Sequence, residues 1–226
     1  AVLQLQGEPQ GRLRINTPMS FGRLHIAPML PAFLKRYPKI NIDMVMDDKT
    51  ADLVEGGFDV AIRAVEMHDS SLIARPLVFL RNALCASPGY LAEYGHPSTL
   101  ADLAEHNCLI FSYSKDVKEW SFVKPIQGDG EGEAESVAVS GNFRVTNSEA
   151  LREQVLNGVG IGRLPTFVVG PDIRSGQLVQ LFPEYEMPGF MMNAVFIERE
   201  YMPAKVRAFL DFTLAHFGEG VPYWEP

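Results

Sequence analysis

The chain has 226 residues, of which 46% are hydrophobic and 21% charged, a composition typical of a globular protein with one large domain or two small lobes. Its formal net charge of −8 disfavours direct DNA binding, because a protein that grips phosphates needs a basic face. Apolar runs stay short of the roughly 18 residues of a membrane span, so the sequence predicts no membrane-embedded segment.

The start of the chain and its cysteines indicate the compartment. Residues 1–10 (AVLQLQGEPQ) have neither the basic start nor the apolar stretch of a signal peptide, which favours a cytoplasmic protein. Cys85 and Cys108 both lie in apolar runs. A disulfide would require their side chains to meet. Two buried free thiols are the favoured interpretation for a cytoplasmic protein.

In chain order, a strand at 11–16 is followed by a turn with hydroxyl groups at 17–22 and then by a helix that ends near Tyr37. Pro28 and Pro31 require that this helix either starts near Pro28 or is kinked. Alternating or continuous apolar patterns predict further strands at 40–46, 58–63, 72–80, 83–86, 108–111, 137–139, 142–145, 158–164, 178–182 and 194–197. Pro76 predicts an edge position for the strand at 72–80.

Helix signals alternate with these strands. The signals are a cap at Asp47 or Asp48 before a short helix that stops at Gly56–Gly57, the pair Ser87–Pro88, capping-box spacing at Thr99/Asp102 and at Thr146/Glu149, Pro165, and a long apolar face from Val206 to Phe217. The polar, glycine-rich stretch 128–135 predicts a hairpin tip or a mobile excursion. Strands alternating with helices predict an α/β protein with mainly parallel sheets, divided into two lobes near Ser87 and near 187–189.

Catalytic motifs are poorly supported. The sequence has no HExxH, GxSxG or CxxC pattern. Gly160 and Gly162 lack the third glycine of a dinucleotide-binding turn. The adjacent acids Asp47 and Asp48 fit a helix cap better than a metal site, because neighbouring side chains point apart. We therefore expect no catalytic residues, no metal and no cofactor, although the fold alone does not exclude an enzyme.

Four phrases, in this order and spacing, resemble the effector-binding domain of LysR-type transcription regulators. They are GRLRINTPMSFGRLHIAPMLPAFLKRYPKINIDM (11–44), DLVEGGFDVAIR (52–63), ASPGYLAEYGHPSTLADLAEHNCLIF (86–111) and SGNFRVTNSEALREQVLNGVGIGRLP (140–165). The resemblance extends from Gly11 to about Phe217. It implies two Rossmann-like α/β lobes joined by two crossover strands, a type 2 periplasmic-binding-protein-like fold with a ligand in the interlobe cleft.

The resemblance also implies an organisation and partners. Residues 1–10 would end a linker, 11–86 with 190–217 would form lobe I, 87–189 lobe II, and 218–226 a C-terminal tail. The expected partners are a small polar or anionic effector and further copies of the chain in a homodimer or tetramer, with DNA bound only through a helix-turn-helix domain that this sequence lacks. The alternative function is a periplasmic solute-binding protein for transport, which would require export.

Ligands of open α/β sheets bind beyond the carboxyl ends of the strands, which selects four turns here. The predicted ligand-binding residues are Thr17, Pro18, Ser20, Phe21, Asp48, Arg63, Thr146, Asn147, Ser148, Leu164, Pro165 and Phe167. Thr17 and Ser20 would supply hydroxyls beside unpaired N–H groups at a helix start, a site suited to an anion. The acids at 47–48 would oppose a carboxylate ligand.

Several of these assignments have alternatives. Ser20 would cap its helix or bind the ligand, and it could do both. Arg63 would pair with an acidic effector or with Asp48. Phe167 would form an apolar wall of the site or belong to the core. The apolar face of the last helix fits either a dimer contact, as the resemblance implies, or burial in its own lobe.

Overall fold

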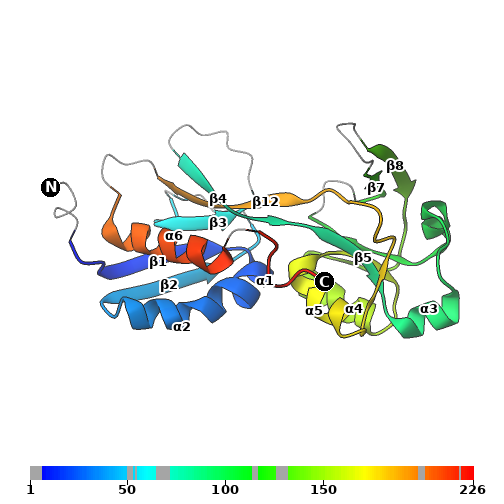
Figure 1. The fold of residues 1–226 in the computed structure, drawn as a ribbon, viewed down its shortest axis with the longest axis horizontal. Helices are drawn as coiled ribbons and strands as arrows, with labels where there is room; N and C mark the ends of the chain where they lie inside the picture. Colours follow the sequence, from blue (N-terminus) through cyan, green and yellow to red (C-terminus); the bar gives the residue numbers. More distant parts are fainter. Residues whose placement is uncertain are drawn as a thin grey trace. The chain divides into compact units, whose positions relative to one another are not determined.

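The computed structural model describes residues 7–49, 53, 55–64, 72–113, 117–125, 132–197, 202–218 and 220–226 (Figure 1). The chain divides into two compact units. Unit 1 comprises Ala1–Phe79 and Phe190–Pro222, and unit 2 comprises Leu80–Gly189 and Tyr223–Pro226. The chain therefore passes between the units three times, first at a point earlier than the predicted boundary at Ser87. The last four residues belong to unit 2 instead of forming a separate tail.

The described residues of unit 1 form a five-stranded sheet in the order β2-β1-β3-β12-β4. β1 (Gly11–Thr17), β2 (Ile40–Met46) and β3 (Val60–Arg63) are parallel, whereas β12 (Phe190–Ile197) is antiparallel to β3. β4 (Leu72–Leu80) lies at the edge of this sheet, as its proline predicts, because proline has no N–H for a second neighbouring strand.

The helix after β1 starts earlier than predicted. α1 (Met19–Phe21), the π-helical turn η2 (Gly22–Ile26) and α2 (Ala27–Arg36) follow one another without a break, so most of the predicted hydroxyl turn is helical. Pro28 lies in the first turn of α2 and Pro31 inside it. Proline disturbs the regular i→i−4 ladder, and a π-turn is one of the ways in which a helix accommodates such an irregularity.

Aromatic side chains join this helix to α6 (Ala204–Phe217) within unit 1. The ring of Phe33 on α2 packs edge-on against Phe209 and Phe212, with centroids 5.7 and 5.3 Å apart. Phe21 lies 5.6 Å from Phe217 by the same measure. Much of the apolar face of α6 is therefore buried in its own lobe, as one of the two predicted alternatives requires.

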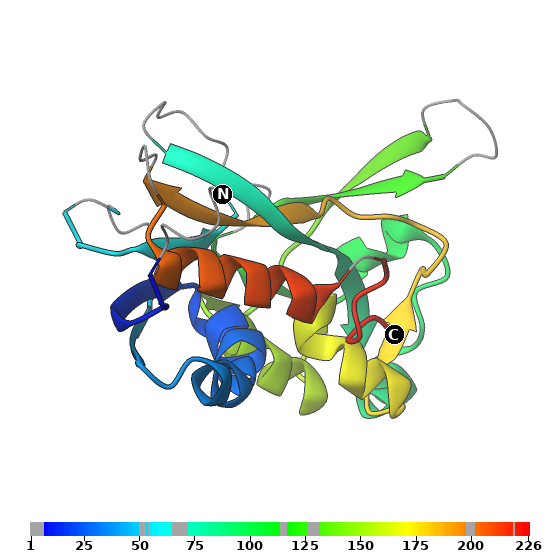
Figure 2. The ribbon, with the colours of Figure 1, turned by 60° about the vertical axis from the view of Figure 1, so that its left-hand side comes forward.

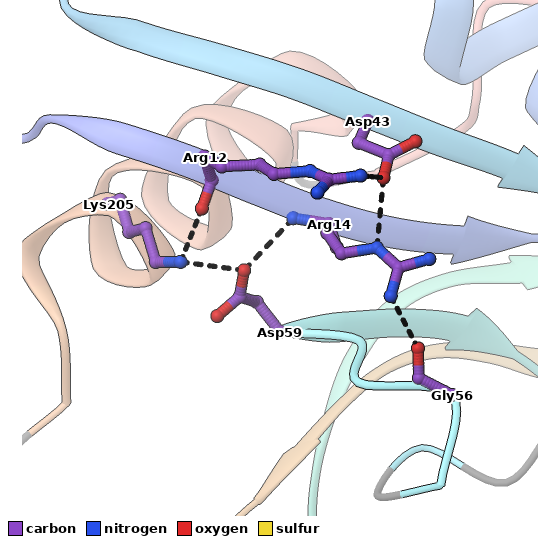
Figure 3. A network of polar contacts seen from close by, with 6 residues as sticks. All are labelled: Arg12, Arg14, Asp43, Gly56, Asp59 and Lys205. Atoms are coloured by element: carbon purple, nitrogen blue, oxygen red, sulfur yellow. Dashed lines mark hydrogen bonds and ion pairs between the residues drawn. The ribbon is translucent and has the colours of Figure 1, made fainter.

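A polar network also fastens the sheet of unit 1 to α6 (Figure 3). The carboxylate of Asp43 on β2 accepts hydrogen bonds from Arg12 and from Arg14 Nε, the latter at 2.9 Å. Asp59, just before β3, accepts from the Arg14 backbone N–H at 2.9 Å and from Lys205 Nζ of α6 at 2.7 Å. The two arginines hold the pKa of Asp43 below its ordinary value.

The described part of unit 2 forms a second five-stranded sheet, in the order β11-β5-β10-β6-β9. β6 (Cys108–Phe111), β9 (Arg144–Val145) and β10 (Ile161–Pro165) are parallel. β5 (Asn82–Ala86) is antiparallel to both β10 and β11 (Val179–Leu181). Both sheets are thus mixed instead of mainly parallel, because the strands that carry the chain between the units run against their neighbours.

The predicted glycine-rich hairpin is flanked by an antiparallel pair, β7 (Glu119–Lys124) and β8 (Glu133–Ala138) (Figure 2). β7 was not predicted, and β8 begins earlier than the predicted strand at 137–139. Residues 128–131 of the predicted tip lie outside the described residues. The same holds for most of the short helix predicted after Asp48, of which the described residues Leu53 and Glu55–Gly57 form turns.

Helix starts in unit 2 follow the predicted caps, with one exception. Ser87 Oγ accepts the N–H of Tyr90 at the start of α3 (Pro88–Tyr94). Thr99 and Asp102 form the predicted capping box of η3 (Leu100–Glu105), which is a 3₁₀-helix.

The exception is α4 (Ser148–Leu156), which is capped by Asn147 and not by Thr146. Asn147 Oδ1 accepts the N–H groups of Glu149 and Ala150 at 3.1 and 2.9 Å. Both Thr and Asn make good caps, and the helix begins one residue later than the capping-box spacing indicated.

Candidate functional site

The parallel strands of unit 1 bring three predicted site segments to one edge of its sheet. Thr17 pairs in register with Met46, and Asn16 with Ala61 of β3, so β1, β2 and β3 end on the same side. Thr17, Met46 and Arg63, the last residues of these strands, define the carboxyl edge of unit 1. This is the edge at which the topology of an α/β sheet favours a ligand.

The loop after β2 caps the helix after β1 at this edge. Asp48 Oδ1 accepts the backbone N–H of Met19 at 2.8 Å. Pro18 occupies the N-cap position and contributes no side-chain cap. The prediction that Ser20 caps this helix is wrong, because Ser20 lies inside α1, where it is buried. Asp48, one of the two predicted caps of the segment after β2, thus caps the helix after β1.

Thr17 and Phe21 are buried beneath the carboxyl edge of unit 1. Thr17 has no exposed area, and its hydroxyl donates to the Pro18 carbonyl at 3.1 Å. A Cβ on Gly22 would stand 1.9 Å from Thr17 Oγ1, so the absence of a side chain at Gly22 lets the helix approach the end of β1. Phe21 is equally buried, against α6. These two side chains shape the turn from inside.

Arg63 ends β3 beside two asparagines. Its Nη2 lies 3.5 Å from Asn16 Oδ1, at the limit of a hydrogen bond, and Asn193 of β12 is its register partner. Asn16 is buried and donates to the Val45 carbonyl of β2 at 3.3 Å. Arg63 is half-buried, and its strand β3 pairs with β1 on one side and with β12 on the other.

Two methionines that the sequence analysis missed flank this edge. Met19 begins α1 and Met46 ends β2, with 43% and 38% of their surfaces exposed. Exposed methionines are flexible, apolar contacts for a ligand. Met46 is the register partner of Thr17, and Met19 lies two residues after Thr17 in the predicted turn, which is the signal that could have identified them.

Unit 2 has a corresponding carboxyl edge, at which β6, β9 and β10 end with Phe111, Val145 and Pro165. Thr146 is exposed there, Asn147 is committed to capping α4, and Ser148 is buried.

The turn into α5 (Thr166–Arg174) contains the other predicted residues of this edge. Leu164 and Phe167 are buried, which agrees with the core alternative for Phe167, while Pro165 is half-buried. The polar group at this turn is Thr166, which the predicted set omitted. Its hydroxyl donates to Glu225 Oε1 at 2.7 Å.

The described residues contain no cluster of three or more metal-ligating side chains. They also contain no helix long and apolar enough to cross a membrane. Cys85 and Cys108 are free and buried, and burial raises the pKa of each thiol to about 12.

Comparison with known proteins agrees with this architecture. The regulatory domain of CrgA from Neisseria meningitidis has a TM-score of 0.79 and 33% identity, covering 93% of this chain and 100% of that domain. The regulatory domain of AphB from Vibrio vulnificus, solved after treatment with cumene hydroperoxide, has a TM-score of 0.74 and 26% identity over 92% of this chain and 99% of that one. The fold is therefore the two-lobed, periplasmic-binding-protein-like fold of such regulatory domains, as predicted.

Sequence comparison identifies the family. Residues 6–218 match the model of the LysR substrate binding domain. The chain is 35% identical over 219 residues to the HTH-type transcriptional regulator PtxR of Pseudomonas aeruginosa, covering 96% of this chain and 68% of PtxR. The chain belongs to the LysR family of transcriptional regulators and comprises their substrate-binding, or effector-binding, domain. These relatives are regulators and not enzymes.

Proposed function

We propose that the chain senses a small molecule and, through a helix-turn-helix domain of the parent regulator, modulates DNA binding and transcription. The effector would bind at the carboxyl edges of the two units, which would line the interlobe cleft that the family resemblance implies. The observation that carries this proposal is the convergence of Pro18, Asp48 and Arg63 at the ends of three parallel strands of unit 1. The regulator relatives favour this function over solute transport.

The chemistry of the edge restricts the effector. Arg63 carries a planar fork of N–H donors, one of which lies 3.5 Å from Asn16 Oδ1, and Asp48 occupies the N–H of Met19. An acidic group can use that helix start only after Asp48 has moved away, because the two carboxylates would repel each other. We therefore expect a small molecule with a polar or acidic group held by Arg63 and an apolar part against Met19 and Met46.

A thermal-shift screen of small metabolites, weighted toward aromatic and aliphatic carboxylates, tests this proposal. A ligand at 100 times its dissociation constant stabilises a protein by about 2.7 kcal/mol, or several degrees in Tm. We expect one chemical class of hits. Stabilisation by none of the compounds, with the protein folded, would contradict recognition of this class of molecule.

The regulatory part of the proposal requires a separate measurement on the full-length regulator. A ligand shifts a conformational equilibrium only when it binds the two states with different affinity. A hit should therefore change the protection pattern or the bending of promoter DNA, and unchanged footprints with a saturating hit would contradict this role. Sedimentation of the purified regulator tests the proposed homodimer or tetramer.

A further inference from the structure

The last residues of the chain, Tyr223–Pro226, are held on α5 of unit 2; we name them the C-terminal clasp. Trp224 is only 1% exposed although two residues remain after it. In two views the C-terminal end lies against α5 (Figures 1 and 2). Specific contacts to α5 hold this segment in place.

One ridge of α5 receives the clasp through three residues spaced one helical turn apart, Thr166, Gly170 and Arg174. Arg174 Nη1 donates to the backbone carbonyls of Trp224 and Glu225 at 2.7 and 2.6 Å. Thr166 donates to the Glu225 carboxylate at 2.7 Å.

Between these two anchors, the backbone of the clasp rests directly on the helix. A Cβ on Gly170 would stand 1.8 Å from the Trp224 carbonyl oxygen, so a glycine at this position is what allows the contact. Hydrogen bonds, burial and a missing side chain thus act together along one side of α5.

The clasp is the next segment of unit 2 after α6, and α6 belongs to unit 1. Trp224 lies seven residues after Phe217, the end of α6, with six residues between them. Even fully extended, they span no more than about 25 Å. While Trp224 is seated on α5, unit 2 cannot move beyond this reach from the end of α6. The other two passages join the units at Phe79–Leu80 and at Gly189–Phe190, so the clasp adds a third connection, from the end of α6.

We propose that the C-terminal clasp is a conformational restraint: seated on α5, it limits the relative motion of the two units, and its release widens that motion. Thr166, one of its anchors, begins α5 at the carboxyl edge of unit 2. If the effector binds there, as proposed above, a ligand group that takes the Thr166 hydroxyl competes with Glu225. Ligand occupancy and clasp release are then linked reciprocally.

The restraint is measured without any ligand, so its test is independent of the proposed function. Nitroxide labels at Lys35→Cys on α2 and Ala92→Cys on α3 report one distance between the units by pulsed electron paramagnetic resonance. Both positions are exposed, and the native thiols are buried with a pKa of about 12, which keeps labelling specific. The reference is the labelled 226-residue chain.

Two variants release the clasp in different ways. Truncation after Pro222 removes it, whereas Gly170→Ala leaves the tail intact and blocks its seat. Alanine favours a helix over glycine, so Gly170→Ala should preserve α5 itself. Gly89→Ala is the matched control, because a Cβ at this helical glycine of unit 2 meets nothing within 4 Å.

We expect a broader distance distribution for the truncation and for Gly170→Ala, and an unchanged one for Gly89→Ala. In the unlabelled 226-residue chain, carboxypeptidase Y, which also releases a C-terminal proline, should remove the tail at least about tenfold faster from Gly170→Ala than from Gly89→Ala, since release exposes the segment. Distributions as narrow as the reference in both release variants, with circular dichroism showing folded protein, would overturn the proposal. Equal carboxypeptidase rates in the two glycine variants would also contradict a seat on Gly170.

Discussion

The carboxylate of Asp48 and the backbone N–H of Met19 lie 2.8 Å apart, so the loop after one strand caps the helix after its neighbour. Replacement of Asp48 by Ala should destabilise unit 1 by about 1 kcal/mol, and replacement by Asn by only a few tenths, because Asn keeps an acceptor. Urea unfolding measures both effects. The control is Asp47→Ala, which loses a local bond to the Lys49 N–H. An equal loss in this control would contradict a specific cap.

Gly22 should tolerate a side chain only when Thr17 is shortened. Gly22→Ala places a methyl group 1.9 Å from Thr17 Oγ1, and overpacking of this kind costs about 1–3 kcal/mol. The double variant Gly22→Ala/Thr17→Ala removes the clashing hydroxyl, so it should unfold at a higher urea concentration than the single glycine variant. Simple additivity of the two substitutions would show that the hydroxyl is not the obstacle.

Arg63 should contribute to affinity more than to folding. For an acidic compound found in the screen, Arg63→Ala should weaken binding by about 2 kcal/mol or more, since a charge-assisted pair is lost. Isothermal titration calorimetry gives the affinity, and Arg75→Ala on the exposed side of β4 is the matched arginine control. Unchanged affinity together with a lower Tm would assign Arg63 to the structure of unit 1.

The two cysteines should be inert in the folded protein. The pKa of about 12 at Cys85 and Cys108 leaves almost no thiolate at pH 8, and only the thiolate reacts readily. Titration with Ellman's reagent should detect two thiols in urea and essentially none in buffer. Fast reaction in buffer would contradict the burial of these side chains as the reason for inertness.

Stability should fall in acid partly through Asp43. Because Arg12 and Arg14 lower the pKa of folded Asp43, its stabilising contribution is complete above the unfolded pKa, near 3.8, and is lost as the pH falls through the lower folded value. Urea midpoints measured from pH 6 to pH 2 should therefore drop less steeply in Asp43→Asn than in the parent chain. The pKa of Asp102 is also lowered in the folded chain. Asp102→Asn should therefore further reduce the dependence of the urea midpoint on pH.

The sequence predicted best where periodicity and local chemistry agree. Strand β2, the caps at Ser87 and Thr99, and α6 follow from alternation, from hydroxyl and carboxylate spacing, and from one apolar face. The position of Arg63 followed from the rule that parallel strands end together.

Interactions between distant segments were not predictable in this way. Asp48 bonds to Met19 across 29 residues, and the Glu225 carboxylate reaches Thr166 across 59. No local pattern encodes such partners, because they depend on strand order and on where the chain returns. The buried position of Thr17 likewise depends on the absence of a side chain at Gly22. The sequence does not show that these two residues meet, because their contact depends on how the helix packs against the end of β1.

The π-helical turn Gly22–Ile26 separates two parts of one helix that have different tasks. A π-turn holds one residue more than an α-turn, and each residue of an α-helix advances the chain by about 100° around its axis. Deletion of a single residue within 22–26 would therefore rotate Met19 and Ser20 to a new direction while Phe33 kept its place against α6. A single insertion or deletion in this turn would therefore change which side chains face the end of β1 without changing the packing of α2 on α6.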